Sequence, residues 1–206
     1  MTQTRLTIAQ ETTFEIDKIK GSRFIAYAYP LSHVSFMEEK VEQLWLKYPD
    51  ARHICWAYRG AHPDHFRIVD DGEPSGTAGK PILTVLEGRG LESIGVAVIR
   101  YFGGTKLGTG GLARAYSSAT QAVIKNCQEK HLRLRTTLTF HIHYSFEASL
   151  LYLLEQHEAV IKDRQYTDQV KVTAVILNEY TDTIKGIVVE KTSGQATIHQ
   201  SVSDWS

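Results

Sequence analysis

The sequence predicts an α+β protein of two domains. Short apolar runs typical of strands alternate along the 206 residues with segments whose apolar residues recur at helical spacing. The composition, 42% hydrophobic and 22% charged, is ordinary for a globular chain with one or two cores. The balance of charge also changes sign near the basic segment HLRLRTT, residues 131–137. We therefore expect one domain at residues 1–135 and a second, smaller domain at residues 136–206.

The first domain is expected to open with two strands and an amphipathic helix. Residues 14–29 predict two strands around the turn Lys20-Gly21-Ser22, and residues 34–48 repeat apolar side chains at a helical period. Pro49-Asp50 then ends the helix. HICWAY and HFRIV follow as two short predicted strands, residues 53–58 and 65–69.

The rest of this domain predicts a helix, a buried strand and a second helix. AGKPILTVLEG, residues 78–88, is helical in pattern, since its proline lies near the start, where proline is tolerated. IGVAVIRYF, residues 94–102, is almost continuously apolar and predicts a buried strand. LARAYSSATQAVIKNC, residues 112–127, has an apolar and a polar face, as an amphipathic helix does.

The second domain has the element order βαββαβ. Residues 137–146 alternate like a strand, and residues 147–157 are helical in pattern. Residues 159–177 predict a strand pair around Thr167-Asp168. A helix at residues 178–191 and a strand at residues 196–202 complete the order. This order suits a ferredoxin-like layer in which both helices cover one face of the sheet.

Positive charge is concentrated around one glycine-rich segment. Residues 1–135 carry 18 Lys and Arg against 14 Asp and Glu, whereas residues 136–206 carry 5 against 9. Residues 88–135 alone carry 8 basic against 2 acidic residues. Such local charge steers polyanions, although a solvated helix face is the structural alternative.

No membrane segment, metal site or cofactor is expected. No apolar run approaches the roughly 20 residues that span a bilayer, and the first residues lack the plan of a signal peptide, so we expect a cytoplasmic protein. Cys55 and Cys127 lack ligand spacing and are expected to be free thiols. His141, His143 and His199 have no carboxylate or cysteine at ligand spacing, so we expect no metal there.

The glycine-rich segment RYFGGTKLGTGGLARAY, Arg100 to Tyr116, predicts a phosphate site. Glycine lets another group approach main-chain N–H donors, and a helix N-terminus favours an anion. The expected phosphate or nucleic-acid contacts are Arg100, Tyr101, Gly103, Gly104, Lys106, Gly108, Gly110, Gly111 and Arg114. GTGGLA formally matches a dinucleotide fingerprint, but the turn before it is too long and Glu129 ends a helix, which disfavours a Rossmann site.

A second segment, DDGEPSGTAGKPIL, residues 70–83, leads into the helix predicted at residues 78–88. Its Gly79-Lys80 fails the Walker A pattern, because Pro74 and Pro81 stand where glycine and Ser/Thr are required. We expect Ser75 or Thr77 to be the N-cap of the helix.

The three carboxylates of this segment have two interpretations. Asp70, Asp71 and Glu73 would compensate the helix dipole and help to cap it; Mg²⁺ binding or acid–base chemistry is the alternative. Asp70 or Asp71 would pair with Arg100 or Lys106. We expect the second segment to complete the site through Asp70, Asp71, Glu73, Thr77 and Lys80.

The stretches DDGEPSGTAGKP and VIRYFGGTKLGTGGLARAY resemble the two characteristic segments of the IMPACT (YigZ-type) family, and the similarity of layout covers essentially the whole chain. The resemblance implies an N-terminal domain with the left-handed βαβ superfold of domain IV of elongation factor G and of GHMP kinases. It implies a C-terminal ferredoxin-like domain comparable to the last domain of that factor. Eukaryotic members of the family are linked to translational control.

The expected function is RNA or ribosome binding in the regulation of translation, without catalysis. Arg100, Lys106 and Arg114 would contact phosphates, and Tyr101 or Phe102 would stack on a base. One alternative is a nucleotide-binding phosphotransfer enzyme of GHMP-kinase-like fold. Another is a protein-interaction adaptor in which the glycines serve packing alone.

Overall fold

The computed structural model describes residues 4–62 and 64–205, with side chains in the last strand up to Ser201. Contacts between residues group Arg5–His131 into one compact unit and residues from Leu132 onward, together with Thr4, into a second. A strand, β7 (Glu129–Ile142), runs through the junction. The division expected after residue 135 therefore falls within a strand and not in a linker.

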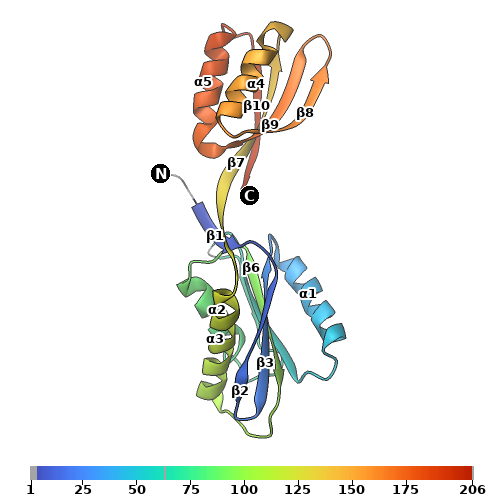
Figure 1. Ribbon diagram of the computed structural model, residues 1–206, viewed down its shortest axis with the longest axis vertical. Helices are drawn as coiled ribbons and strands as arrows, with labels where there is room; N and C mark the ends of the chain where they lie inside the picture. Colours follow the sequence, from blue (N-terminus) through green and yellow to red (C-terminus); the bar gives the residue numbers. More distant parts are fainter. Residues whose placement is uncertain (1–3, 63, 206) are drawn as a thin grey trace. The chain divides into compact units, whose positions relative to one another are not determined.

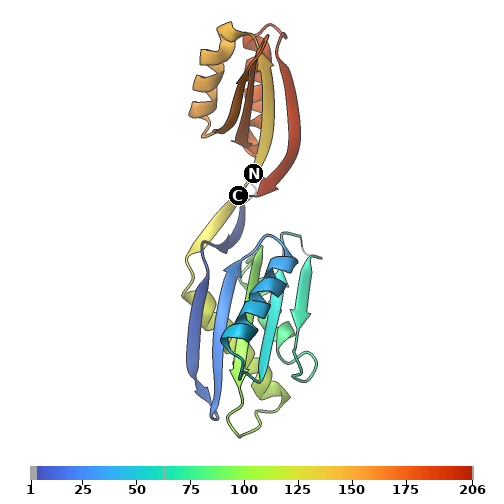
Figure 2. The ribbon, with the colours of Figure 1, turned by 90° about the vertical axis from the view of Figure 1, so that its right-hand side faces the viewer.

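The N-terminal unit is built on a five-stranded antiparallel sheet. Its strand order is β2-β3-β6-β4-β5, which can be followed in Figure 2. Both β3 and β4 pair antiparallel with β6, so the two run parallel to each other, with β6 between them. The strands are β2 (Thr12–Ile19), β3 (Ser22–Pro30), β4 (His53–Arg59), β5 (Phe66–Val69) and β6 (Ile94–Tyr101).

Helices cover both faces of this sheet. As Figure 1 shows, α1 (Val34–Lys47) lies on one face, while α2 (Gly79–Gly88) and α3 (Thr109–Lys125) lie on the other. Central strand β6 is buried on both sides: Val96 and Val98 belong to the core under α2 and α3, and Ala97 and Ile99 to the core under α1. The continuous apolar run of β6 follows from this double burial.

The ends of α1 are set by local sequence. His33 is the N-cap, and its side chain accepts a hydrogen bond from the N–H of Ser35. The N–H of Tyr48 donates to the carbonyl of Leu44 in the last turn, and Pro49 follows. Within the helix, buried Met37 and Leu44 lie on the face that packs on the sheet. The helix therefore begins and ends close to where the apolar spacing predicted.

The C-terminal unit has the predicted βαββαβ order. Its strand order, β10-β7-β9-β8, with antiparallel neighbours, is that of a ferredoxin-like sheet, and β1 (Thr4–Ile8) also pairs with β7. The prediction of an α+β chain with a ferredoxin-like second half is confirmed. Besides β7, the elements are a 3₁₀ turn (Tyr144–Phe146), α4 (Glu147–Gln156), β8 (Val160–Tyr166), β9 (Val170–Leu177), a 3₁₀ turn (Asn178–Tyr180), α5 (Thr181–Lys191) and β10 (Thr197–Trp205).

Both helices of this unit pack on the same face of its sheet. Phe140 of β7 and Val172 of β9 meet Leu154 of α4 and Ile184 of α5 in a single core. All four side chains are fully buried. In the part of the chain that the structure describes, no helix is both long and apolar enough to cross a bilayer.

Candidate functional site

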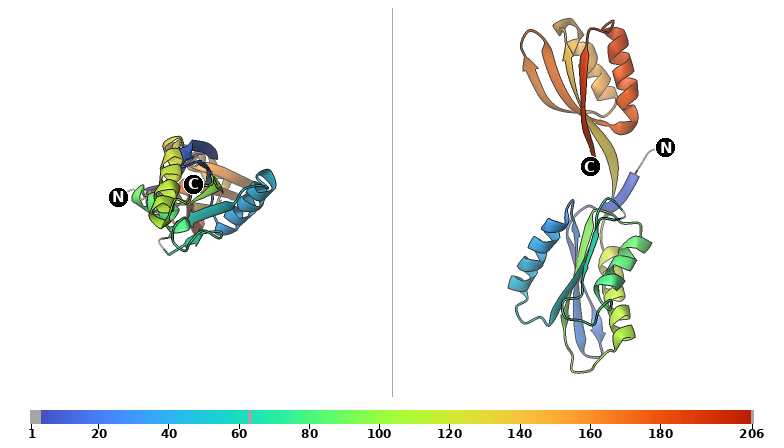
Figure 3. Two further views of the ribbon diagram at one scale, coloured as in Figure 1. Left: turned by 90° about the horizontal axis from the view of Figure 1, so that it is seen from below. Right: turned by 180° about the vertical axis from the view of Figure 1, so that it is seen from behind.

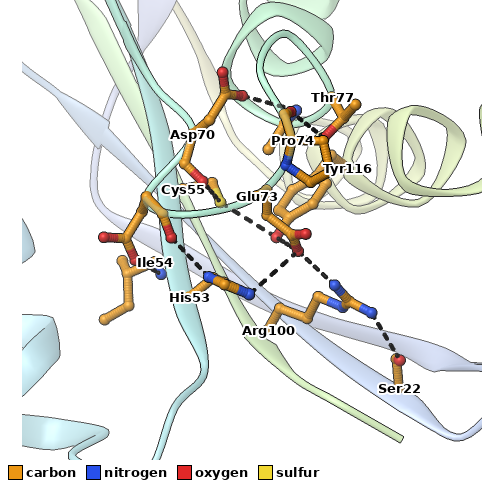
Figure 4. A network of polar contacts seen from close by, with 12 residues as sticks. Ser22, His53, Ile54, Cys55, Asp70, Glu73, Pro74, Thr77, Arg100 and Tyr116 are labelled. Carbon is orange, nitrogen blue, oxygen red and sulfur yellow. Dashed lines mark hydrogen bonds and ion pairs between the residues drawn. The ribbon is translucent and has the colours of Figure 1, made fainter. Parts of the chain in front are cut away.

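Glu73 joins the two glycine-containing segments of the N-terminal unit. Its side chain is buried, and Oε1 accepts hydrogen bonds from Nη1 of Arg100 at 2.5 Å and from the hydroxyl of Tyr116 at 2.9 Å (Figure 4). Arg100 lies near the end of β6, and Tyr116 lies in the second turn of α3. The loop before α2 is thereby tied to both sides of the glycine loop.

Arg100 is a structural cation. It is only 5% exposed, and its guanidinium lies 5.7 Å from the centre of each of the rings of Phe24 and Phe102. Its Nη2 donates a 3.4 Å hydrogen bond to the hydroxyl of Ser22. Since the buried Glu73 carboxylate already pairs with it, Arg100 does not present a free charge at the surface. The expected contact between Arg100 and a phosphate is corrected on this ground.

The network extends into β4 through Cys55 and His53. Sγ of Cys55 lies 3.2 Å from the hydroxyl of Tyr116 and 3.0 Å from the carbonyl oxygen of Asp70. His53 places Nε2 4.0 Å from Oε1 of Glu73. Burial raises the pKa of the Cys55 thiol and of the Tyr116 hydroxyl, so both stay protonated near neutral pH. A protonated thiol is a poor nucleophile.

Asp70 caps α2 from eight residues before the N-cap. Oδ1 accepts hydrogen bonds from the N–H groups of Ala78 and Gly79 at 3.0 and 2.8 Å, and Oδ2 accepts one from Gly76 at 2.8 Å. The N-cap itself is Ala78, so the prediction of Ser75 or Thr77 is wrong. The hydroxyl of Thr77 instead donates to the carbonyl of Pro74 at 2.6 Å. The chain's own carboxylate thus occupies the anion position at this helix.

Asp71 is also held by the main chain. Its Oδ2 accepts the N–H of Ile54 at 2.7 Å, and its carbonyl oxygen accepts a 2.6 Å hydrogen bond from Nδ1 of His53. The predicted pairing of Asp70 or Asp71 with Arg100 or Lys106 is wrong, because Glu73 is the partner of Arg100 and Lys106 forms no ion pair with any described residue. Across the described residues, no three metal-binding side chains come together.

The first glycine of the loop serves packing. A Cβ atom on Gly103 would lie 1.9 Å from the carbonyl carbon of Gly21 in the β2–β3 turn, so any other residue would clash with that turn. The N–H of Gly103 donates to the hydroxyl of Ser22 at 3.2 Å. This amide is not available to a ligand.

Beyond Gly103 the loop lies at the surface and leads into α3. Gly108 is the N-cap, with φ +72°, a conformation that favours glycine, and it offers no side-chain cap. The first N–H bonded within the helix is that of Leu112, which donates to Gly108. Within the described chain, the N–H groups of Thr109, Gly110 and Gly111 have no hydrogen-bond partner, and the first turn contains no acidic residue. The positive end of α3 is uncompensated.

Two exposed cations flank this helix end. A Cβ atom on Gly110 would lie 3.9 Å from Nη1 of Arg114, so this guanidinium is beside the first turn. Lys106 lies in the loop before the helix. Neither Arg114 nor Lys106 forms an ion pair with any described residue, and the same holds for exposed Lys80 on α2.

The two aromatic residues of the loop differ in exposure. The Phe102 ring is 50% exposed. Tyr101 is half-buried, and the guanidinium of Arg23 lies 5.4 Å from the centre of its ring. Of the two, Phe102 offers the larger free surface to a planar ligand.

Sequence reasoning did not identify Ser22, His53 or Tyr116 as part of the site. Ser22 and His53 come from β3 and β4, which are far from the glycine loop in sequence and lie beside it because both strands pair with β6. Tyr116 alone could have been found from the sequence. Its hydroxyl lies on the apolar face of α3, and a buried hydroxyl requires a hydrogen-bond partner.

Known proteins resemble the chain over nearly its full length. A family model described as the Impact N-terminal domain matches residues 20–124, and one described as a domain of unknown function (DUF1949) matches residues 140–195.

Individual relatives agree with these matches. An IMPACT family member of Haemophilus influenzae is 34% identical, covering 88% of this chain and 90% of its own. IMPACT family member YigZ of Escherichia coli is 36% identical, covering 73% and 76%. A crystal structure of a hypothetical protein has a TM-score of 0.72 at 30% identity and covers 96% of this chain and 97% of its own. These matches show that the chain belongs to the IMPACT family.

Proposed function

We propose that the chain is an RNA- or ribosome-binding protein that acts in translation and binds phosphate groups at the N-terminus of α3. The observation that carries this proposal is the set of three N–H groups at Thr109, Gly110 and Gly111 that have no partner among the described residues, beside the guanidinium of Arg114, which forms no ion pair with them. Such donors at the positive end of a helix dipole favour an anionic oxygen.

The residues proposed to contact nucleic acid differ from the sequence-based set. Lys106 and Arg114 stay as phosphate contacts because they are exposed and unpaired among the described residues. Arg100 is left out because it is buried against Glu73. Of the two rings expected to stack on an unpaired base, Tyr101 and Phe102, Phe102 is kept, since half of its surface is open.

The acidic residues near the site are already bonded to other protein groups, which supports an anion site. Asp70 is bonded to three N–H groups at α2, and Glu73 is paired with Arg100. Their charges are thus compensated within the fold, so they repel an incoming polyanion less than free carboxylates would. Lys106, Arg114 and the α3 dipole then dominate the local potential.

The two alternative functions find less support. A phosphotransfer enzyme would need a free carboxylate to hold Mg²⁺, yet Asp70, Asp71 and Glu73 are all bound by protein groups. An adaptor whose glycines serve only packing would need contacts at each of them. Gly103 meets this condition, but nothing lies within 4 Å of a Cβ placed on Gly104 or Gly108.

The test is the salt dependence of RNA binding. Anisotropy of a fluorescent single-stranded RNA, titrated with the full chain at 50 to 300 mM salt, should give a log–log slope that reflects the phosphates contacted. Arg114→Ala and Lys106→Ala should each weaken binding and reduce that slope by about 1. Lys125→Ala provides the matched control, because it removes a cation from the opposite end of α3.

Two kinds of result would contradict the proposed function. Affinity that does not respond to salt, or equal losses in Lys125→Ala and Arg114→Ala, would remove the phosphate site at α3. Heat of binding from ATP with Mg²⁺, in the absence of RNA binding, would instead favour the phosphotransfer alternative.

A further inference from the structure

The sheet of the C-terminal unit has one face without helices. Along β7, buried Leu138, Phe140 and Ile142 alternate with residues that point away from α4 and α5. Figure 3, in its right-hand view, shows the strands in front of the more distant α4. The face turned away from the two helices is called here the open face.

The open face carries two cross-strand rows of polar side chains. Strand register places the first row as His199, Thr139, Thr173 and Asp163, across β10, β7, β9 and β8. The second row, across the same strands, is Thr197, His141, Lys171 and Gln165. All eight residues are half-buried or exposed, and each ends in a hydrogen-bonding or charged group.

Two of these residues are aromatic and lie together. The rings of His141 and His199 are 5.7 Å apart between centroids and perpendicular to each other. Lys171 is directly opposite His141 on the neighbouring central strand. The hydroxyl oxygens of Thr139 and Thr173 are 3.3 Å apart in the adjoining row. Rings, a cation and hydroxyls therefore meet on the two central strands and β10.

Charge in this unit is divided between its two sides. Residues 136–206 carry more acidic than basic residues, 9 against 5, but most of the acidic ones belong to the helical layer. Among described side chains, the carboxylate on the open face is Asp163, which accepts a 2.7 Å hydrogen bond from Gln165. No described carboxylate pairs with Lys171. The acidic residues in or beside α4 and α5 are Glu147, Glu155, Glu158, Glu179, Asp182 and Glu190.

We infer that the open face is a second contact surface for single-stranded RNA, in which His141 and His199 stack on bases and Lys171 binds a phosphate. This inference rests on the proposed function and extends it to the C-terminal unit. The RRM shows that a four-stranded sheet can bind single-stranded RNA by stacking two or three bases on its aromatic side chains. Histidine rings and hydroxyls serve this role, and every base has a face that can stack.

The test compares variants of the open face in the full chain. His141→Ala with His199→Ala should weaken binding of fluorescent oligouridine about tenfold, as expected for the loss of stacked bases. His141→Phe with His199→Phe should keep most of the affinity, since the rings remain. Lys171→Ala should weaken binding severalfold and lower the salt slope, whereas Lys191→Ala, on exposed α5, is the matched control with no effect.

Crosslinking gives a readout that is independent of affinity. Photo-crosslinking of 4-thiouridine RNA to the unmodified chain, followed by mass spectrometry, should label peptides from β7 and β10 that contain His141 and His199. Circular dichroism of each variant establishes that it is folded.

The outcomes separate this inference from the proposed function. Normal binding by all open-face variants, with losses in Arg114→Ala and Lys106→Ala, overturns the second surface and leaves the α3 site intact. Losses confined to the open-face variants would instead overturn the α3 site and leave the second surface intact. Failure of the wild-type chain to bind RNA overturns both.

Discussion

Glu73 is the residue on which the arrangement of the N-terminal site most depends. Its buried carboxylate accepts from Arg100 and Tyr116, which come from β6 and α3. A buried charge is tolerated only while it is paired and hydrogen-bonded, so neither Glu73 nor Arg100 is dispensable alone. At the scale of single residues, this carboxylate is held within the fold by Arg100 and Tyr116.

Removal of Glu73 should therefore be costly. Glu73→Ala leaves Arg100 buried without its partner, and the free energy of unfolding should fall by about 3–5 kcal/mol. Glu15→Ala, which breaks an exposed pair with Arg23, should cost at most about 1 kcal/mol. Urea denaturation of both variants checks this difference, and equal losses would contradict it.

Two glycines of the loop should respond in opposite directions. Gly103→Ala should destabilise the protein by about 1–3 kcal/mol, because its Cβ would overlap the β2–β3 turn. Gly110→Ala should stabilise it by roughly 0.5–1 kcal/mol, since the site is helical and open, yet weaken RNA binding, because a methyl group would then stand beside the N–H donors of the first turn. Thermal unfolding and RNA anisotropy measure the two effects, and an RNA affinity unchanged in Gly110→Ala would argue against a ligand there.

At the scale of elements, the N-termini of α2 and α3 differ in whether a side chain caps their N–H groups. Asp70 satisfies Gly76, Ala78 and Gly79 ahead of α2. No side chain caps Gly108 at the start of α3. An internal carboxylate thus closes one helix end to outside anions, and the other end stays open.

The cap of α2 can be tested by substitution. Asp70→Ala should lower the free energy of unfolding by about 1–2 kcal/mol, because three N–H groups lose their acceptor. Ser75→Ala should change it by less than about 0.5 kcal/mol, since exposed Ser75 is not the N-cap. Chemical denaturation distinguishes the two, and a larger loss in Ser75→Ala would restore the sequence-based prediction of the cap.

At the scale of the whole molecule, each compact unit has its own core. The N-terminal unit buries one core on each side of its sheet, and the C-terminal unit buries one between its sheet and α4 with α5. Separate cores favour separate opening of the two units.

Hydrogen exchange should reveal this independence. Leu154→Ala removes a fully buried side chain from the C-terminal core and should cost about 2–5 kcal/mol there. Amides of β9 and α4 should then exchange much faster, while those of β3 and β6 keep their rates. Equal acceleration in β3 and β6 would mean that the chain opens as one unit.

The elements were predictable because each is specified by local spacing. The helical period of residues 34–48 and the apolar run of residues 94–102 appear as α1 and β6 within a few residues. The βαββαβ order of the second half was also readable, since each of its strands and helices has its own local apolar period. The expected division after residue 135 was not equally readable, because β7 continues through it without a turn signal.

The sequence by itself determined the elements, the α+β class and the presence of two unusual segments, because these follow from neighbours a few positions apart. Only the tertiary structure decided which charges stay free. Arg100 and Glu73 are 27 positions apart in sequence, yet the path of β6 and the loop before α2 brings them together and buries them. Arg114, on the exposed side of α3, has no such partner among the described residues. Burial and pairing depend on the packing of distant segments, which no local pattern records.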